Sequence, residues 1–172
     1  MKLFILLQVF LVQVFLVILC LSCEEKPVGG TTNWRIDRPL VAQLQNGSGR
    51  SITIDEKTFE LHAYLWRDFQ PFSPSDGKAL VSINWLVDTD SVNVPNHITL
   101  SEQFVIHGDS IWTANYTDEK RESAPYVQER VSLNGPKWGP DLEVTVVARV
   151  TDFRTGTGYY LRRDHVTIGR TD

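Results

Sequence analysis

The feature of this chain that most constrains its fold is an alternation of apolar and other residues with a period of two. Residues 60–67, 81–88 and 142–151 all follow it. This period is typical of strands with one buried face. The residues expected to be buried are Leu61, Ala63 and Leu65 in the first segment, Val81, Ile83, Trp85 and Val87 in the second, and Leu142, Val144, Val146, Ala148 and Val150 in the third.

Turn residues predict two hairpins between such strands. Gly108-Asp109 stands between two apolar runs, and a pair that begins with glycine suits a two-residue hairpin loop. Residues 155–158 form a longer Gly-containing loop between a strand that ends at Arg154 and the next strand, which begins at Tyr159. The strands on either side of each loop are therefore expected to pair as antiparallel neighbours.

The rest of the chain adds short strands and little helix. Strands are also expected at residues 51–54, 126–133 and 166–168. Helical spacing is limited to residues 40–45 and 123–130, where a short turn of helix is possible.

An antiparallel sheet with one apolar face must bury that face against a second sheet or close on itself. For residues 34–172 we therefore predict an all-β, two-sheet antiparallel β-sandwich, with a small closed barrel as the alternative. The hairpins, the apolar-in strands and an inward Trp85 resemble an immunoglobulin-type or fibronectin-type module. The chain lacks the paired cysteines of true immunoglobulin domains.

The N-terminal region reads as an export signal. Lys2 is followed by residues 3–19, which are apolar apart from Gln8 and Gln13. A retained transmembrane anchor is the alternative, although this run is shorter than the roughly 20 residues that a comfortable span needs.

The two cysteines of the chain, Cys20 and Cys23, lie at the end of this run. A zinc site would need a second pair, and a redox centre would need a helix N-terminus beside one thiol. Cys20-Leu21-Ser22-Cys23 resembles the lipobox of bacterial lipoprotein precursors, with Cys20 where such precursors usually carry Leu. The resemblance implies a signal peptide over residues 1–22, lipid on Cys23 and a tether over residues 23–33. Ordinary signal-peptidase cleavage, which leaves Cys23 as a free thiol, is the alternative.

The same resemblance implies a location and a partner. A lipidated Cys23 would hold the protein in the cell envelope, with the outer membrane as the expected membrane, and would anchor it without spanning the bilayer. Glu24 and Glu25 resemble the acidic tag of some surface-exposed lipoproteins, so both a periplasmic and an exterior orientation are possible.

Charge excludes one class of partner. Removing residues 1–22 leaves 150 residues, enough for one domain, and changes the net charge from −4 to −5 because Lys2 is lost. Nucleic-acid binding requires a basic surface, so no nucleic-acid partner is expected.

Motifs for catalysis or metal binding are missing from the sequence. It has no nucleophile elbow, no phosphate-binding glycine loop and no paired histidines at metal-ligand spacing. Asp88-Thr89-Asp90 begins like a calcium loop, but Val92 and Asn93 stand where the motif needs an oxygen ligand and a glycine. We therefore expect no metal, no cofactor and no enzyme activity. A hydrolase with scattered residues stays as an alternative, and its candidates are His62, His107, His165, Asp109 and Asp164.

Aromatic side chains are the best candidates for ligand binding. Trp138 lies in a rigid loop rich in glycine and proline, and Tyr64 and Trp66 share the strand face opposite Leu61 and Leu65. Rigid aromatic rings suit recognition of sugar faces or partner proteins. Packing in the core, or plugging its open end, is the alternative for all three. The sequence thus predicts a lipid-anchored, non-enzymatic binding or accessory module, with a glycan or an envelope protein as the possible ligand.

Overall fold

The computed structural model describes residues 34–117 and 123–172. The predicted signal segment 1–22 and tether 23–33, Cys23 included, lie outside the described residues. Residues from Thr32 to Asp172 form one compact unit. Across the two described ranges, no helix is long and apolar enough to cross a membrane.

Strands make up most of the described chain, as the alternation predicted, and the all-β fold class is confirmed. The elements in chain order are β1 (Trp34–Ile36), α2 (Arg38–Gly47), β2 (Ser51–Ile54), β3 (Lys57–Asp68), β4 (Leu80–Asp88), β5 (Ile98–His107), β6 (Ser110–Asn115), β7 (Val127–Gly135), β8 (Glu143–Asp152) and β9 (Thr157–Thr171).

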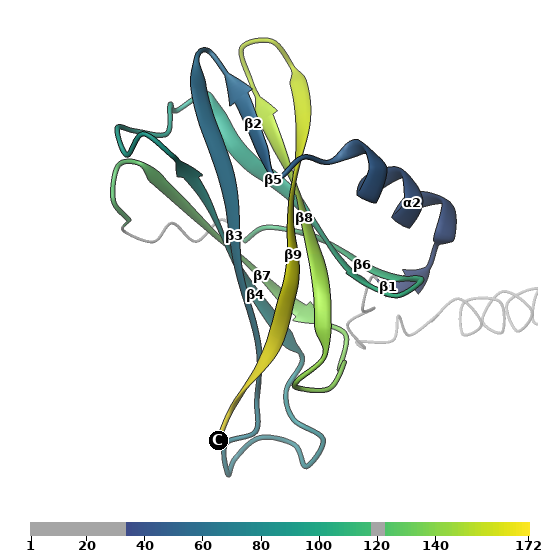
Figure 1. Cartoon of the computed structure of the whole chain (residues 1–172). Helices are drawn as coiled ribbons and strands as arrows, with labels where there is room; N and C mark the ends of the chain where they lie inside the picture. Colours follow the sequence, from purple (N-terminus) through teal and green to yellow (C-terminus); the bar gives the residue numbers. More distant parts are fainter. Residues whose placement is uncertain (1–33, 118–122) are drawn as a thin grey trace, which may run out of the picture. The chain divides into compact units, whose positions relative to one another are not determined.

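The strands form one curled sheet (Figure 1). Its order is β1-β6-β5-β8-β9-β3-β4-β7, and β2 pairs with the first part of β3, residues 57–60. Most neighbours are antiparallel, but β3 and β9 pair in parallel over residues 65–68 and 168–171. The expectation of purely antiparallel pairing is therefore wrong, and the sheet is mixed.

The long strand β9 explains this mixed pairing. From Thr157 to Thr167 it pairs antiparallel with β8, and only beyond that point does it run beside β3. The β8–β9 register shifts between Val144 and Val146, and His165 across from this shift has a φ of 57°. An irregularity of this kind bends a strand and increases its twist. The bend lets one strand join the β1-β6-β5-β8 group to the β3-β4-β7 group.

Both predicted hairpins are present. Gly108, with a φ of 56°, and Asp109 connect β5 to β6. The β8–β9 hairpin closes earlier than expected, because Asp152 pairs with Thr157 and the loop occupies residues 153–156.

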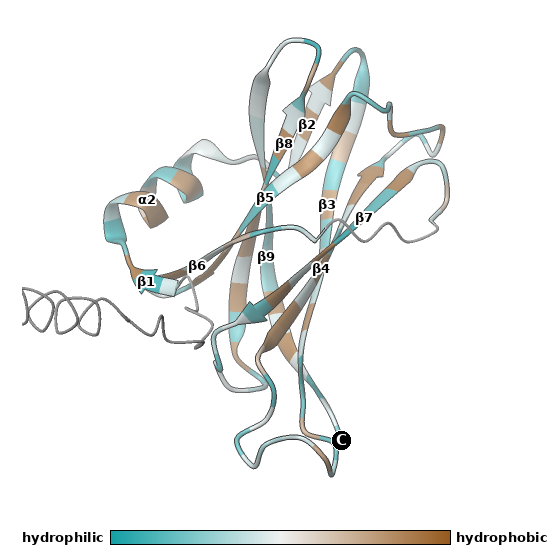
Figure 2. Ribbon diagram, turned by 180° about the vertical axis from the view of Figure 1, so that it is seen from behind, coloured by the Kyte–Doolittle hydropathy of each residue, from teal (hydrophilic) through white to brown (hydrophobic). Residues whose placement is uncertain are grey.

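Apolar side chains from both groups of strands meet inside the curl. The expected faces of β3 and β8 are confirmed, since Leu61 and Leu65 are buried together with Val146 and Ala148. Trp112 is 1% exposed in the same cluster. Figure 2 shows the alternation of apolar and polar residues along these strands.

The helix α2 covers the outside of the sheet over β5, β6 and β8. It confirms the helix expected at residues 40–45, and the carboxylate of Asp37 caps it by accepting a hydrogen bond from the backbone N–H of Leu40. Val41 and Leu44 pack against Phe104 and Val147. The other possible helical segment, residues 123–130, is not a helix, because its residues from Val127 onward form the start of strand β7.

The inward and outward faces of strand β4 are the reverse of the prediction. Its inward residues are Leu80, Ser82, Asn84, Leu86 and Asp88, and the face that contains Trp85 points outward. Two of the inward polar residues have partners: the Asn84 side-chain N–H group donates to Gln103 Oε1 at 2.6 Å and to Tyr116 Oη at 3.0 Å, and the Asp88 carboxylate accepts from Lys57 at 2.9 Å. Hydrogen bonding removes much of the cost of burying polar atoms, so this orientation is tolerated.

Candidate functional site

The outward side of β3, β4 and β7 carries a surface that is mainly apolar, and we call it the outer face. Its residues are Tyr64, Trp66, Val81, Ile83, Trp85, Val87, Val131 and Leu133. The strand register places Tyr64 beside Ile83, and Ile83 beside Val131, so the three rows are contiguous. Within the described residues the single helix, α2, packs on β5, β6 and β8, so it leaves this face without helical cover (Figures 1 and 2).

Two of the predicted ligand-binding residues, Tyr64 and Trp66, lie together on the outer face. Their rings are stacked with centroids 5.4 Å apart and an interplanar angle of 19°. Tyr64 is 46% exposed, so packing in the core is excluded for this residue. Gly169 of β9 leaves room for the Tyr64 ring, because a Cβ atom there would lie 3.1 Å from the phenol oxygen.

Trp85 holds the middle of the outer face. Its indole N–H donates a 2.7 Å hydrogen bond to Glu129 Oε2, which fixes the ring across β4 and β7. Beside it, Ile83 is 9% and Val131 is 2% exposed. The sequence predicted Trp85 as an inward core residue, and this assignment is wrong.

The third predicted residue, Trp138, lies apart from this pair. It is partly buried and packs against the interior cluster, as the plug alternative proposed. Its ring meets Trp34 edge-on at 6.4 Å and lies 5.7 Å from the His107 ring. Since the outer face points away from the interior, Trp138 does not form one site with Tyr64 and Trp66.

The loop that carries Trp138 is held by a buried cation, Arg67, which the sequence did not single out. Its guanidinium donates to the backbone carbonyls of Lys137 at 3.2 Å and Trp138 at 3.3 Å. It also donates to the carbonyls of Asp76 and Lys78 in the β3–β4 loop. Arg67 is 3% exposed, and this burial lowers its pKa from the ordinary arginine value. Arg67 therefore joins two loops to the end of β3.

A polar groove separates the start of β5 from β7. Its volume is about 780 Å³, and Thr99, Tyr116, Gln128 and Arg130 contribute to its lining. The Gln128 side chain accepts a 2.7 Å hydrogen bond from the backbone N–H of Leu100, so it bridges the two strands where they do not pair. No local pattern in β7 marks Gln128, because its partner is 28 residues away.

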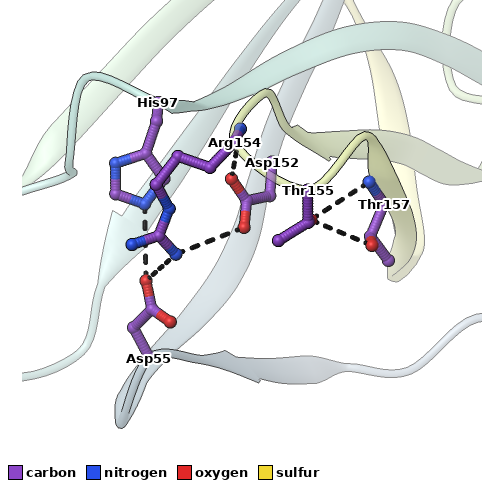
Figure 3. A network of polar contacts seen from close by, with 6 residues as sticks. All are labelled: Asp55, His97, Asp152, Arg154, Thr155 and Thr157. Atoms are coloured by element: carbon purple, nitrogen blue, oxygen red, sulfur yellow. Dashed lines mark hydrogen bonds and ion pairs between the residues drawn. The ribbon is translucent and has the colours of Figure 1, made fainter.

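One end of the molecule carries the ionic network of Figure 3. The Arg154 guanidinium contacts Asp55 and lies 3.4 Å from Asp152, and His97 lies 3.4 Å from Asp55. Burial raises the pKa of Asp152, but hydrogen bonds from the backbone and side chain of Arg154 outweigh it, and the net effect lowers the pKa. The same contacts, led by the one to Asp152, raise the pKa of Arg154. The network ties together the β2–β3 loop, the β8–β9 hairpin and the segment before β5.

The hydrolase alternative requires its scattered candidates to meet in one pocket. Asp164 and His165 do share a small pocket of about 390 Å³. Asp164 is paired with Arg50 at 3.3 Å and with Arg162 at 3.2 Å, and His165 contacts Glu143 at 2.7 Å. The residues that line the pocket include no serine, threonine or cysteine to act as a nucleophile.

Carboxylates do not gather into a metal site in the part of the chain that the structure describes. Asp88, in the segment that begins like a calcium loop, is instead bound by Lys57 at 2.9 Å and by the backbone N–H groups of Asp90 and Asn93, each at 3.1 Å.

The described surface thus offers an exposed apolar and aromatic face, a polar groove and several closed ion-pair networks. Comparison of the chain with protein-family models, with curated proteins and with solved structures found no match. A function for this chain is therefore inferred from its own sequence and geometry.

Proposed function

We propose that this protein is a non-enzymatic binding or accessory module of the cell envelope, anchored by lipid on Cys23, that binds its partner through the outer face. The observation that carries the binding role is the stack of the exposed Tyr64 on the partly buried Trp66, within a contiguous apolar surface. Contiguous apolar surface on a water-exposed sheet marks interaction sites. The lipobox-like segment before Cys23 supports the anchor and an outer-membrane location, facing either the periplasm or the exterior.

We propose the immunoglobulin-like sandwich as the finer description of the fold. Two strand groups with a shared apolar interior support it, namely β1-β6-β5-β8 and β3-β4-β7. β9 passes between the groups, so each group has one face toward the common core.

An envelope protein is the partner that we favour, and a glycan is the second candidate. Tyr64 and Trp66 each turn one ring face toward the other, so one face of each ring is covered by its neighbour and the pair does not form one flat platform. Stacking on a sugar needs an open ring face. A protein surface is less restrictive, because aromatic anchors in protein interfaces fill pockets by shape. The exposed His62 and Glu60 on the same strand face supply the hydrogen-bonding groups that would favour a glycan.

The anchor is tested by labelling. Cells that express the full chain and grow with a labelled fatty acid are expected to label the wild type and not the Cys23→Ala variant, because the acylated thiol is the attachment point. Cys20→Ala is the matched control and is expected to keep the label. Label that persists in Cys23→Ala would contradict the anchor.

The binding face is tested by removing the aromatic stack. The Tyr64→Ala/Trp66→Ala variant, immobilised and exposed to detergent-solubilised envelope, is expected to capture its ligand roughly tenfold or more weakly than wild type, because aromatic anchors dominate interface energies. Phe153→Ala, which removes an aromatic ring that is 67% exposed outside the outer face, is the control and is expected to bind as wild type.

The same experiment separates the two ligand classes. Capture that is lost after protease treatment of the extract indicates an envelope protein, and capture that survives and is competed by soluble polysaccharide indicates a glycan. Equal capture by wild type and by the aromatic double variant would refute the outer face as the binding surface.

A further inference from the structure

The first strand carries exposed apolar residues beside Trp138, and we call Trp34, Ile36 and Trp138 the tether-end patch. Trp34 is 44% and Ile36 is 70% exposed. They are two residues apart on β1, and all three residues of this strand are exposed. Trp34 meets Trp138 edge-on at 6.4 Å, so the two indoles form one aromatic surface. The carbonyl of Trp138 is held by Arg67, which fixes the loop behind it.

Charges around the tether-end patch are paired with one another. Arg35 lies 3.0 Å from Asp37, and Arg38 lies 2.7 Å from Asp109. Behind Trp138, Lys137 lies 2.6 Å from Asp76. These three basic groups are therefore balanced by three acidic groups. A surface with paired charges suits contact with a neutral membrane interface. Binding to a strongly anionic membrane usually uses unpaired lysine and arginine side chains.

Chain length limits how far this patch can be from Cys23. Ten residues separate Cys23 from Trp34. Fully extended, the eleven steps from Cys23 to Trp34 span at most about 40 Å. A link of that length raises the local concentration of the patch at the anchoring surface to the order of 1 mM, so even a weak affinity suffices for contact.

We infer that the tether-end patch lies on the lipid headgroup surface, with the indoles of Trp34 and Trp138 at the interface. This inference rests on the proposed lipidation of Cys23 and names the bilayer itself as a second partner of the folded domain. Tryptophan is enriched at membrane interfaces because its ring is apolar and its N–H is polar. Contact at this end leaves the outer face free for the envelope partner, since that face lies on the other side of β3 from the interior against which Trp138 packs.

The test uses the processed, full-length protein purified from membranes and reconstituted into phosphatidylcholine vesicles. One sample carries lipid brominated on acyl carbons close to the headgroup, and the other carries unbrominated lipid. Bromine quenches the fluorescence of tryptophan that lies at the interface, so the tryptophan fluorescence of the wild type is expected to be weaker in brominated than in unbrominated vesicles. Trp34→Phe is expected to lose part of this quenching, because Trp138 still contributes, and Trp34→Phe/Trp138→Phe is expected to lose most of it. Trp66→Phe, on the outer face, is the matched control and is expected to keep it.

The charge pairing adds a second readout. Because the basic groups around the patch are paired, the quenching is expected to be the same when part of the phosphatidylcholine is replaced by an anionic lipid. Quenching that is unchanged in Trp34→Phe, or that is lost in Trp66→Phe instead, overturns the inference. Mass spectrometry of the same preparation separates the two proposals: Cys23 without acyl groups overturns both, whereas acylated Cys23 without Trp34-dependent quenching overturns only this one.

Discussion

Replacing Arg67 by methionine is expected to lower the free energy of unfolding by roughly 3–5 kcal/mol, because it removes the buried donor of four partly buried hydrogen bonds to backbone carbonyls. The guanidinium donates at 2.8 Å to the carbonyl of Lys78, and it also binds the carbonyls of Asp76, Lys137 and Trp138. Methionine keeps the apolar stem but supplies no N–H group. Urea unfolding at neutral pH, followed by tryptophan fluorescence, measures the change.

Arg170→Met is the matched control for this prediction. The Arg170 guanidinium lies 4.2 Å from the centroid of the same Phe69 ring that Arg67 contacts at 5.0 Å. Its side chain is 48% exposed, so the expected loss is only about 0.5–1 kcal/mol. Arg67→Met is also expected to alter the near-ultraviolet circular dichroism of the Trp138 loop, and Arg170→Met is not. Equal losses of stability in the two variants would contradict the role assigned to Arg67.

Replacing Asp88 by asparagine is expected to cost roughly 2–3 kcal/mol at neutral pH, because it leaves the Lys57 ammonium without its counterion. The Asp88 side chain is fully buried, whereas that of Lys57 is 25% exposed, and this partial exposure keeps the cost below that of a completely buried pair. The asparagine side chain also places its NH2 group opposite one of the two backbone N–H groups that donate to the Asp88 carboxylate, so that hydrogen bond is lost. Asp90→Asn, at an exposed position two residues away, is the control and is expected to change stability by less than about 0.5 kcal/mol.

The same carboxylate gives the protein a pH dependence. Burial raises the pKa of Asp88, but hydrogen bonds from Lys57 and from the backbone of Asn93 and Asp90 outweigh it, and the net effect holds the pKa below the ordinary aspartate value. A lowered folded-state pKa contributes stability that is present above the unfolded value of about 3.9 and is lost as the pH falls through the folded value. Acid titration of the unfolding free energy should therefore show a smaller loss below about pH 5 in Asp88→Asn than in wild type. A loss of the same size in both would contradict the assignment.

Local patterns predicted the elements well, because strand and helix periods depend on residues close in sequence. The period of two located β3, β4 and β8, the Gly108-Asp109 pair located the β5–β6 hairpin, and the helix at residues 40–45 is present within α2. The inward face of β3 also followed from its pattern, since one side is clearly more apolar than the other.

Strand β4 shows where that reasoning stops. Hydrophobicity alone favours an inward face made of Val81, Ile83 and Trp85, yet Asn84 and Asp88 lie on the inward face and are fully buried. Asn84 is satisfied by Gln103, 19 residues away, and Asp88 by Lys57, 31 residues away. Such partners cannot be read from neighbours in the sequence, and they contribute to deciding which face of β4 turns inward.

For the candidate site, the sequence identified Tyr64 and Trp66 on one strand face and Trp138 in a separate loop, and it left packing as the alternative for all three. The structure stacks the exposed Tyr64 on the partly buried Trp66 and packs Trp138 against the interior cluster, beside Trp34. The two faces of β3 point in opposite directions, outward with Tyr64 and Trp66 and inward toward the core. The Trp138 loop, held by Arg67, lies on the inward side, and the sequence alone does not give the position of this loop.

By itself, the sequence determined that this chain is all-β, where most of its strands lie and which residue types could bind a partner, since these depend on period, turn chemistry and composition. Only the tertiary structure decided that β3 and β9 pair in parallel, that β4 turns its polar residues inward, and that the one helix of residues 34–117 and 123–172 leaves an apolar sheet face uncovered. The physical reason is that these outcomes depend on contacts between residues far apart in the chain, whose hydrogen bonds and packing form only when the sheet curls.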